Sequence, residues 1–160
     1  MIDHSKYAKE LFMQGYNCCQ AVLAAFCEDL GLDFDLAAKL SSSFGGGMGR
    51  LREVCGAVCG MFMVAGMKFG YADPKDNKAK AEHYKLVQEL AEQFRQNNGS
   101  IVCRELMGLD EGHSSPIHPG ADSPIPEKRT PGYYKKRPCA ELVADAAKII
   151  EDMIKTKEQL

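Results

Sequence analysis

A run of 14 residues, from Val54 to Met67, contains no charged side chain. A helix that crosses a membrane needs about 20 apolar residues, so this run is too short to be a membrane span. It predicts a helix that is buried in the core of the protein, without insertion into a membrane. The helix would follow the glycine-rich segment FGGGMGR, which occupies residues 44–50.

The rest of the chain also has helix signals, and no segment alternates apolar and polar residues as a half-buried strand does. The 160 residues are long enough to bury one core. We therefore expect an all-α, single-domain bundle of about six to seven helices over residues 1–160. The expected helices are those of residues 5–13, 18–30, 36–42, 53–69, 77–96, 101–107 and 139–154.

Residues 108–138 interrupt this pattern and predict a long Pro-rich loop within the domain. Five of the seven prolines lie between Gly108 and Arg137, and long loops of this kind commonly act as lids over functional sites. Two tyrosines, Tyr133 and Tyr134, would either anchor the loop over such a site or have only a packing role in the fold. His113 and His118 are weaker candidates for metal ligands, because histidines in loops are more commonly solvated than ligating.

Seven cysteines are the chemically distinctive part of the composition. The first residues lack the basic and continuous apolar regions of a signal peptide, so we expect a cytoplasmic, reducing environment. In that environment, clusters of cysteines more often bind metals or take part in catalysis than form structural disulfides. The formal net charge of −2 and the lack of a nucleic-acid-binding motif argue against a nucleic-acid partner.

Four cysteines fall in the first turn of four different predicted helices: Cys18, Cys55, Cys103 and Cys139. Asn17, Ser100 and Pro138 are the expected starts of three of these helices. A helix start offers unpaired N–H groups and the positive end of the helix dipole, and both favour the thiolate over the thiol. Basic residues adjoin all of these cysteines except Cys18. The alternative is that cysteines serve as small apolar side chains, which we favour for Cys27 and leave open for Cys19.

The glycines next to these cysteines suggest a crowded backbone. Gly46, Gly47 and Arg50 are candidates for binding a cofactor. Glycines let the backbone pass close to Cys55, and the backbone N–H groups of the glycine-rich segment can then point toward a thiolate or a bound anion. The segment lacks the lysine and the preceding strand of a phosphate-binding P-loop. Within the next helix, Gly56 and Gly60 share one face and predict the close approach of another helix.

No CxxC pair is present, so neither a thioredoxin-type dithiol nor a zinc ribbon is indicated. Cys55 and Cys59 are four residues apart on one helix face, however, and such a pair can bind one metal or react together.

Four segments of the chain resemble the C_GCAxxG_C_C family of redox-active proteins. These segments are GYNCCQAVL, FGGGMGRLREVCGAVCG, SIVCRELMG and CAELVADAA. The resemblance implies a small helical protein with redox activity, and it matches the signature cysteines to Cys18, Cys55, Cys103 and Cys139. This chain adds Cys19, Cys27 and Cys59, so the active set would hold four or five thiols. The resemblance implies no particular substrate.

These observations leave three functions open. The first is a redox site, and thus an oxidoreductase, in which Cys55 is the nucleophile and Cys59 or Cys18 the resolving thiol. In a second form of this site, Cys18, Cys55, Cys103 and Cys139 hold an iron–sulfur cluster or a zinc or iron ion. The second function is a non-enzymatic carrier of zinc, copper(I) or iron, because thiolates suit these soft metals. The third is a helical interaction module whose cysteines only pack. Expected partners are a redox protein, a small thiol or disulfide, and a second copy in a homodimer.

Overall fold

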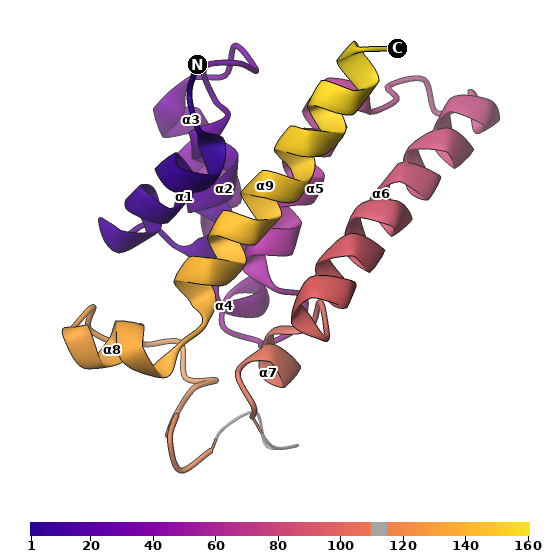
Figure 1. The fold of residues 1–160 in the computed structure, drawn as a ribbon. Coiled ribbons are helices and arrows are strands. Elements are labelled where there is room, and N and C mark those ends of the chain that lie inside the picture. Colours follow the sequence, from indigo (N-terminus) through magenta and orange to yellow (C-terminus); the bar gives the residue numbers. More distant parts are fainter. Residues whose placement is uncertain (110–114) are drawn as a thin grey trace.

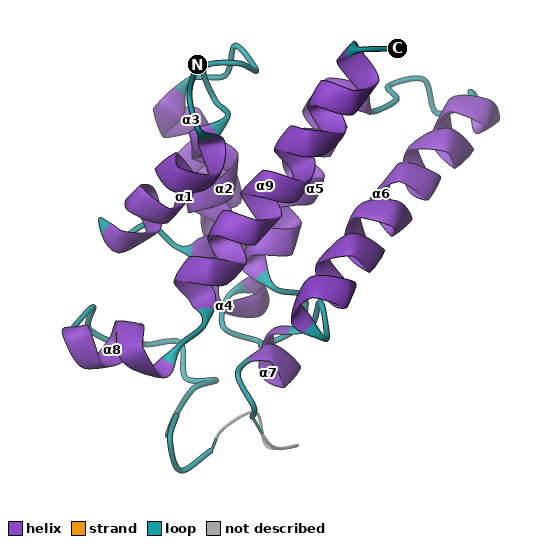
Figure 2. Ribbon diagram, in the orientation of Figure 1, coloured by secondary structure: helices purple, strands orange, loops and turns teal. Residues whose placement is uncertain are grey.

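The computed structural model describes residues 1–109 and 115–160, and the described chain is helical without any β-strand (Figures 1 and 2). This confirms the all-α fold class. The longer helices are α1 (His4–Met13), α2 (Cys18–Ala25), α3 (Phe34–Ser41), α5 (Gly56–Phe69), α6 (Asn77–Asn98) and α9 (Cys139–Glu158). The shorter elements are η1 (Ser42–Phe44), α4 (Gly45–Met48), α7 (Cys103–Leu106) and α8 (Pro131–Lys136). Of these, α4 and α8 were not predicted as helices.

The uncharged run forms α5, which packs against α2, α6 and α9. Val58, Met61 and Val64 on this helix have no exposed surface, so the prediction of a core helix is confirmed. Among the described residues, every helix is too short or too polar to cross a membrane.

The close approach predicted for the glycine face of α5 is also confirmed. A Cβ atom on Gly60 would lie 2.8 Å from the Cβ atom of Val22, and one on Gly56 would lie 3.0 Å from that of Cys18. Both distances are shorter than a normal contact, so only glycine lets α2 pack this closely. The contact places the first turn of α2 beside the first turn of α5.

A short antiparallel contact sets the start of α5 and corrects two predicted helices. The N–H of Cys55 donates to the carbonyl of Ile101 at 2.8 Å, and the N–H of Cys103 donates to the carbonyl of Glu53 at 2.6 Å. Because these extended residues pair with each other, α5 begins at Gly56 and α7 begins at Cys103, later than expected. Ser100 does not cap α7, and its hydroxyl accepts from the N–H of Val102 instead.

The remaining expected helix bounds need smaller corrections. The helix expected over residues 18–30 ends at Ala25, and the chain continues in turns. Within the predicted loop of residues 108–138, residues 131–136 form α8 with Thr130 as its side-chain cap.

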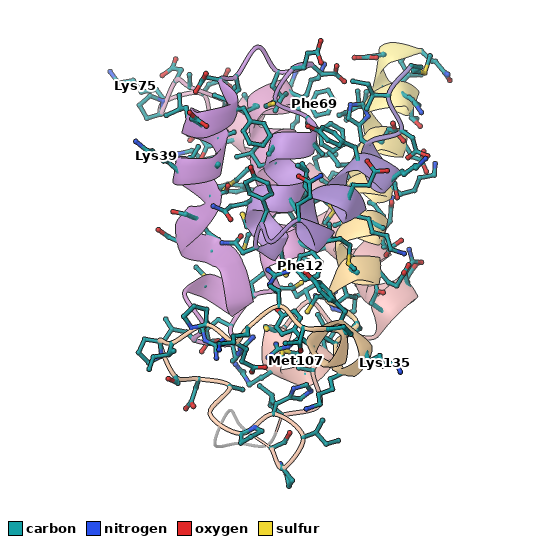
Figure 3. All side chains as sticks on the ribbon, turned by 90° about the vertical axis from the view of Figure 1, so that its left-hand side faces the viewer. Phe12, Lys39, Phe69, Lys75, Met107 and Lys135 are labelled. Carbon is teal, nitrogen blue, oxygen red and sulfur yellow. The ribbon has the colours of Figure 1, made fainter. Side chains whose placement is uncertain are left out.

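The short elements gather at one end of the bundle, where α4, α7 and α8 lie near the start of α9 (Figure 1). In Figure 3, Met107 and Lys135 mark this end, and Phe69 and Lys75 mark the opposite end. Residues 115–130 also reach this end, where they contribute to the pocket described below.

Candidate functional site

The four helix-start cysteines meet at one pocket, which has a volume of about 280 Å³. Cys18, Cys103 and Cys139 are the first residues of α2, α7 and α9, and Cys55 is the residue immediately before α5. All four line the pocket. The sequence therefore located these cysteines at helix starts correctly, and the fold brings the helix starts together.

The candidates in the glycine-rich segment line the same pocket, whereas Cys59 is not among its lining residues. Gly46, Gly47 and Arg50 all lie on the pocket wall. The Cys59 thiol contacts the carbonyl of Val54 at 3.9 Å, and Cys103 is the one pocket thiol whose charge affects the pKa of Cys59.

The glycine-rich segment forms a left-handed turn. From Gly46 to Arg50, the φ angles all lie between 65° and 72°, and Arg52 has a φ of 60°. This conformation costs about 1–2 kcal/mol for each residue that has a side chain, and such strain is typical of functional sites. A Cβ atom on Gly47 would lie 2.5 Å from that of Cys103, so glycine is required at this position.

The turn directs Arg52 into the interior, where only 2% of its surface is exposed. Its Nε donates to the carbonyl of Ala121 at 2.8 Å, and its Nη1 lies 3.2 Å from the sulfur of Met107 and 3.6 Å from that of Cys103. Its Nη2 is buried and has no hydrogen-bond partner among the described residues. A buried guanidinium thus adjoins one of the pocket thiols.

Arg137, directly before Pro138, also lines the pocket. Its Nη2 lies 2.5 Å from Oε1 of Glu127, and its Nη1 lies 3.4 Å from the sulfur of Met107. Only 7% of its surface is exposed, and its buried Nε also has no partner within the described chain. Arg52 and Arg137 therefore both contact one methionine sulfur.

Two further arginines tie the Pro-rich segment to the bundle. Arg50 donates to the carbonyls of Ser123, at 2.5 Å, and Gly120, at 3.3 Å. Arg129 donates to the carbonyls of Phe12 and Tyr16, both at 3.0 Å.

The tied segment contributes to the pocket wall. Its Pro124 and Pro126 line the pocket, and the hydroxyl of Tyr134 donates to the carbonyl of Met13 at 3.2 Å. Tyr133 also lines the pocket, and its ring lies 4.5 Å from the guanidinium of Arg137. The segment is thus held beside the pocket thiols by defined contacts.

One pocket thiol has a lowered pKa. A hydrogen bond from the Cys18 thiol lowers the pKa of Cys139 to about 7, and the positive charges of Arg137, Arg52 and Arg129 act in the same direction. Burial opposes these effects but is outweighed by them. The same hydrogen bond, together with burial, raises the pKa of Cys18 well above its usual value. Of the two thiols, Cys139 is therefore the one on which the negative charge is favoured.

The other two helix-start cysteines behave differently from the expectation. Burial raises the pKa of Cys55, although the N–H groups of Val58 and Ala57 act against it. Burial also raises the pKa of Cys103, against a hydrogen bond from Arg52. A helix start alone therefore does not produce a thiolate in this protein, because the loss of hydration is the larger effect.

The three additional cysteines lie outside the pocket lining. Cys19 is fully buried, with its thiol 3.8 Å from the sulfur of Met63. Burial raises the pKa of Cys19, and it raises that of Cys59 to about 11. Cys27 is half-buried near the end of α2, and burial raises its pKa as well.

The histidines predicted as weaker ligands are tested only in part. His113 lies outside the described residues. His118 is buried, and burial and then the charge of Arg137 lower its pKa.

The thiols as placed do not form a metal-binding set. All seven cysteines are free, and the described residues contain no group of three or more cysteine, histidine or acidic side chains that could hold a metal ion. Cys18, Cys55, Cys103 and Cys139 line one pocket, so they are the residues that would have to rearrange to bind a metal.

Sequence reasoning missed part of the site. The sequence indicated Arg52 and Arg137 only as basic neighbours of Cys55 and Cys139, and it gave no signal for Arg129, Glu127 or Met107. Their proximity to the thiols depends on long-range contacts. The Thr130–Pro131 pair is a signal for the start of α8, but it does not indicate what the preceding Arg129 contacts.

Comparisons with known proteins give one match. The model of a family described as "Putative redox-active protein (C_GCAxxG_C_C)" matches residues 16–153, a span that contains all seven cysteines. Searches of curated proteins and of solved structures give no match.

Proposed function

The chain belongs to the C_GCAxxG_C_C family, and from this premise we propose that it is a thiol–disulfide redox protein in which Cys139 and Cys18 form the reactive pair. The observation that carries the proposal is the pairing of these two thiols in a pocket lined by arginines. A thiolate is the form of cysteine that attacks a disulfide, and the lowered pKa of Cys139 provides that form near neutral pH.

The exchange proceeds in two steps. The Cys139 thiolate attacks one sulfur of a substrate disulfide, which forms a mixed disulfide and releases the first substrate thiolate. Cys18 gives its proton to that thiolate or to solvent and attacks the Cys139 sulfur of the mixed disulfide. The Cys18–Cys139 disulfide forms, and the second substrate thiolate leaves. The substrate gains two electrons, which the two cysteines lose.

This assignment differs from the prediction that Cys55 is the nucleophile. Cys55 is buried with a raised pKa, so less of it is a thiolate at neutral pH than of Cys139. Cys18 keeps its predicted role as the resolving thiol, and its contact with Cys139 supports that role better than the position of Cys59 does. A redox protein or a small thiol in a reducing cytoplasm would then return the disulfide to the dithiol.

A metal centre is the second candidate function, and the convergence of four cysteines on one pocket supports it. Cys18, Cys55, Cys103 and Cys139 would hold zinc, iron or an iron–sulfur cluster after rearrangement, and such a centre would supply either electron transfer or metal storage.

The deciding experiment oxidises the reduced protein under anaerobic conditions with one equivalent of hydroxyethyl disulfide. We expect a loss of two thiols that a reductant reverses, and peptide mapping should identify a Cys18–Cys139 disulfide. Cys27→Ser serves as a control, because Cys27 lies outside the pocket lining, and it should give the same product. Oxidation of a pair that lacks Cys139, or no oxidation at all, would refute the proposal.

Metal analysis of the freshly isolated protein tests the second candidate. Stoichiometric zinc, or iron with acid-labile sulfide, that is lost in Cys139→Ser would favour the metal centre. Protein that is free of metal and oxidises reversibly would favour the dithiol.

A further inference from the structure

The thiol pocket concentrates positive charge in a chain whose formal net charge is −2. Four arginines line it, Arg50, Arg52, Arg129 and Arg137, and among the described residues of the lining Glu127 is the one acidic side chain. These side chains leave an excess of three positive charges. If Cys139 is a thiolate, an excess of two remains.

Within the described residues, one carboxylate pairs with these arginines, so the excess of three positive charges stays unbalanced there. Arg50 and Arg129 donate to backbone carbonyls, which are neutral, and Arg137 pairs with Glu127. Arg52 contacts a carbonyl and two sulfur atoms, and no carboxylate in the described part of the chain forms an ion pair with it. A buried charge without a counter-charge is costly, so a bound anion would stabilise the pocket.

Two buried donors also lack partners. Nη2 of Arg52 and Nε of Arg137 make no hydrogen bond to any described residue, although both side chains are more than nine-tenths buried. In folded proteins, most buried polar groups have a partner. Both guanidiniums contact the Met107 sulfur, so the two donors belong to side chains that lie close together.

The chemistry of the two side chains indicates what would occupy this place. A guanidinium presents planar N–H groups that match the two oxygens of a carboxylate or another oxyanion. The Cys103 thiol beside Arg52 is a weak acceptor, and its raised pKa leaves it mainly uncharged. An oxyanion from outside the chain would satisfy both the charge and the free donors.

We propose that Arg52 and Arg137 bind the anionic group of the substrate, so that the pocket selects small disulfides that carry carboxylates. This inference rests on the proposed function, and the bonds that form and break are those of the exchange with Cys139 and Cys18. The pocket volume of about 280 Å³ is near the lower end for small-molecule sites, which suits a small linear disulfide. Pro124 and Pro126 line the pocket from the Pro-rich segment and limit its size.

Three small linear disulfides that differ in charge test the proposal on the unmodified protein. Dithiodipropionate carries two carboxylates, hydroxyethyl disulfide is neutral, and cystamine carries two ammonium groups. We expect the second-order rate constant for oxidation of the reduced protein to be about tenfold higher for the dicarboxylate than for the neutral disulfide, and lowest for cystamine. The preference should shrink as salt is added, because salt screens the arginine charges.

Arginine variants test which side chains carry the preference. Arg52→Gln and Arg137→Gln should each bring the ratio of the dicarboxylate rate to the neutral rate closer to one. The ratio is the informative quantity, because a change in the thiolate fraction of Cys139 affects both rates equally. Arg95→Gln is the matched control, since Arg95 lies on α6 and pairs with Glu92, and it should leave the ratio unchanged.

The outcomes separate this inference from the proposed function. Equal rates for the three disulfides, or the fastest rate for cystamine, would overturn the inference while the exchange chemistry stands. No reaction with any of them would overturn the proposed function. If no disulfide reacts but the dicarboxylate raises the melting temperature of the protein, and Arg52→Gln reduces that rise while Arg95→Gln does not, the anion site stands without the exchange chemistry. The charge series requires no variant, so a failure of Arg52→Gln to fold would not affect it.

Discussion

Cys18 and Cys19 are neighbours in the chain, yet they belong to two different sulfur environments. Cys18 faces the thiol pocket, where it pairs with Cys139. Cys19 lies between α2 and α5, where its thiol is 3.8 Å from the sulfur of Met63 and the charge of Cys59 contributes to its raised pKa; we call these three residues the sulfur cluster. In both places, a thiol of α2 has a sulfur-containing side chain of another helix as its partner.

The two environments differ in charge and in access. The thiol pocket contains arginines and space for a small molecule, whereas Cys19 in the sulfur cluster is fully buried and makes its contact with a neutral methionine. The pKa of Cys139 is lowered, and those of Cys19 and Cys59 are raised. The comparison teaches that a nearby thiol and positive charges favour a thiolate here, and that closeness of two sulfur atoms is not sufficient.

The largest expected effect separates the two environments directly. Cys139→Ser should lower the rate of oxidation by hydroxyethyl disulfide by about 100-fold or more, because the attacking thiolate is lost. Cys59→Ser should lower it by less than about threefold. The rates are measured by loss of free thiols. A comparable loss in Cys59→Ser would restore Cys59 to the site and remove the distinction.

Stability gives the next test, through two glycines. Gly47→Ala should lower the free energy of unfolding by about 3 kcal/mol, because its positive φ and the contact with Cys103 both oppose a side chain. Gly66→Ala is the matched change, since α5 leaves open space there, and it should raise stability by up to about 1 kcal/mol. Denaturant unfolding under reducing conditions measures both. Equal effects would show that the left-handed turn does not constrain the pocket.

The pH dependence of alkylation tests the pairing of Cys18 and Cys139. The iodoacetamide rate at Cys139, followed by mass spectrometry, should rise with pH with a midpoint near 7 and fall as the thiolate is protonated below it. At neutral pH, Cys139 should hold roughly tenfold more thiolate than an ordinary cysteine.

Cys18→Ala is the informative variant for this pairing, because it removes the hydrogen bond that most lowers the pKa of Cys139. The midpoint should move to higher pH. An unchanged midpoint would mean that the arginines alone produce the thiolate.

The smallest expected effect concerns the charge of Arg52. Arg52→Gln removes one of the charges that lower the pKa of Cys139, so the alkylation midpoint should rise and the rate at neutral pH should fall by roughly threefold. Arg95→Gln is the control, because Arg95 lies on α6 and pairs with Glu92. It should leave the alkylation midpoint of Cys139 unchanged. A shift of the same size in both variants would indicate a general charge effect and not a local one.

The sequence predicted much of the fold and the most visible part of the site. The uncharged run from Val54 to Met67 and the glycine face of α5 led to a core helix closely packed by a neighbour, and both were confirmed. The helix-start placement of the four cysteines was also correct, because caps such as Asn17 act on residues close in sequence.

The errors in the prediction have a common cause. The later starts of α5 and α7 depend on hydrogen bonds between residues near Glu53 and residues near Ile101, which a local pattern cannot reveal. The expectation that each helix start favours a thiolate was wrong for Cys18, Cys55 and Cys103, whose pKa values are raised, and the pKa of Cys139 is lowered chiefly by its hydrogen bond with Cys18. Neither the burial of these thiols nor the partner of Cys139 could be known from the sequence. Arg129 and Glu127 were missed, since their contacts join parts of the chain that are far apart.

The sequence by itself determined the helical class, the core helix and the positions of Cys18, Cys55, Cys103 and Cys139 at helix starts. These properties depend on side-chain periodicity and capping within a few residues. Only the tertiary structure decided that these helix starts meet, that buried arginines surround them, and that Cys139 has the lowered pKa. The reason is physical, because the charge state of a thiol depends on its hydration and on the charges around it, and both are set by residues that are distant in sequence.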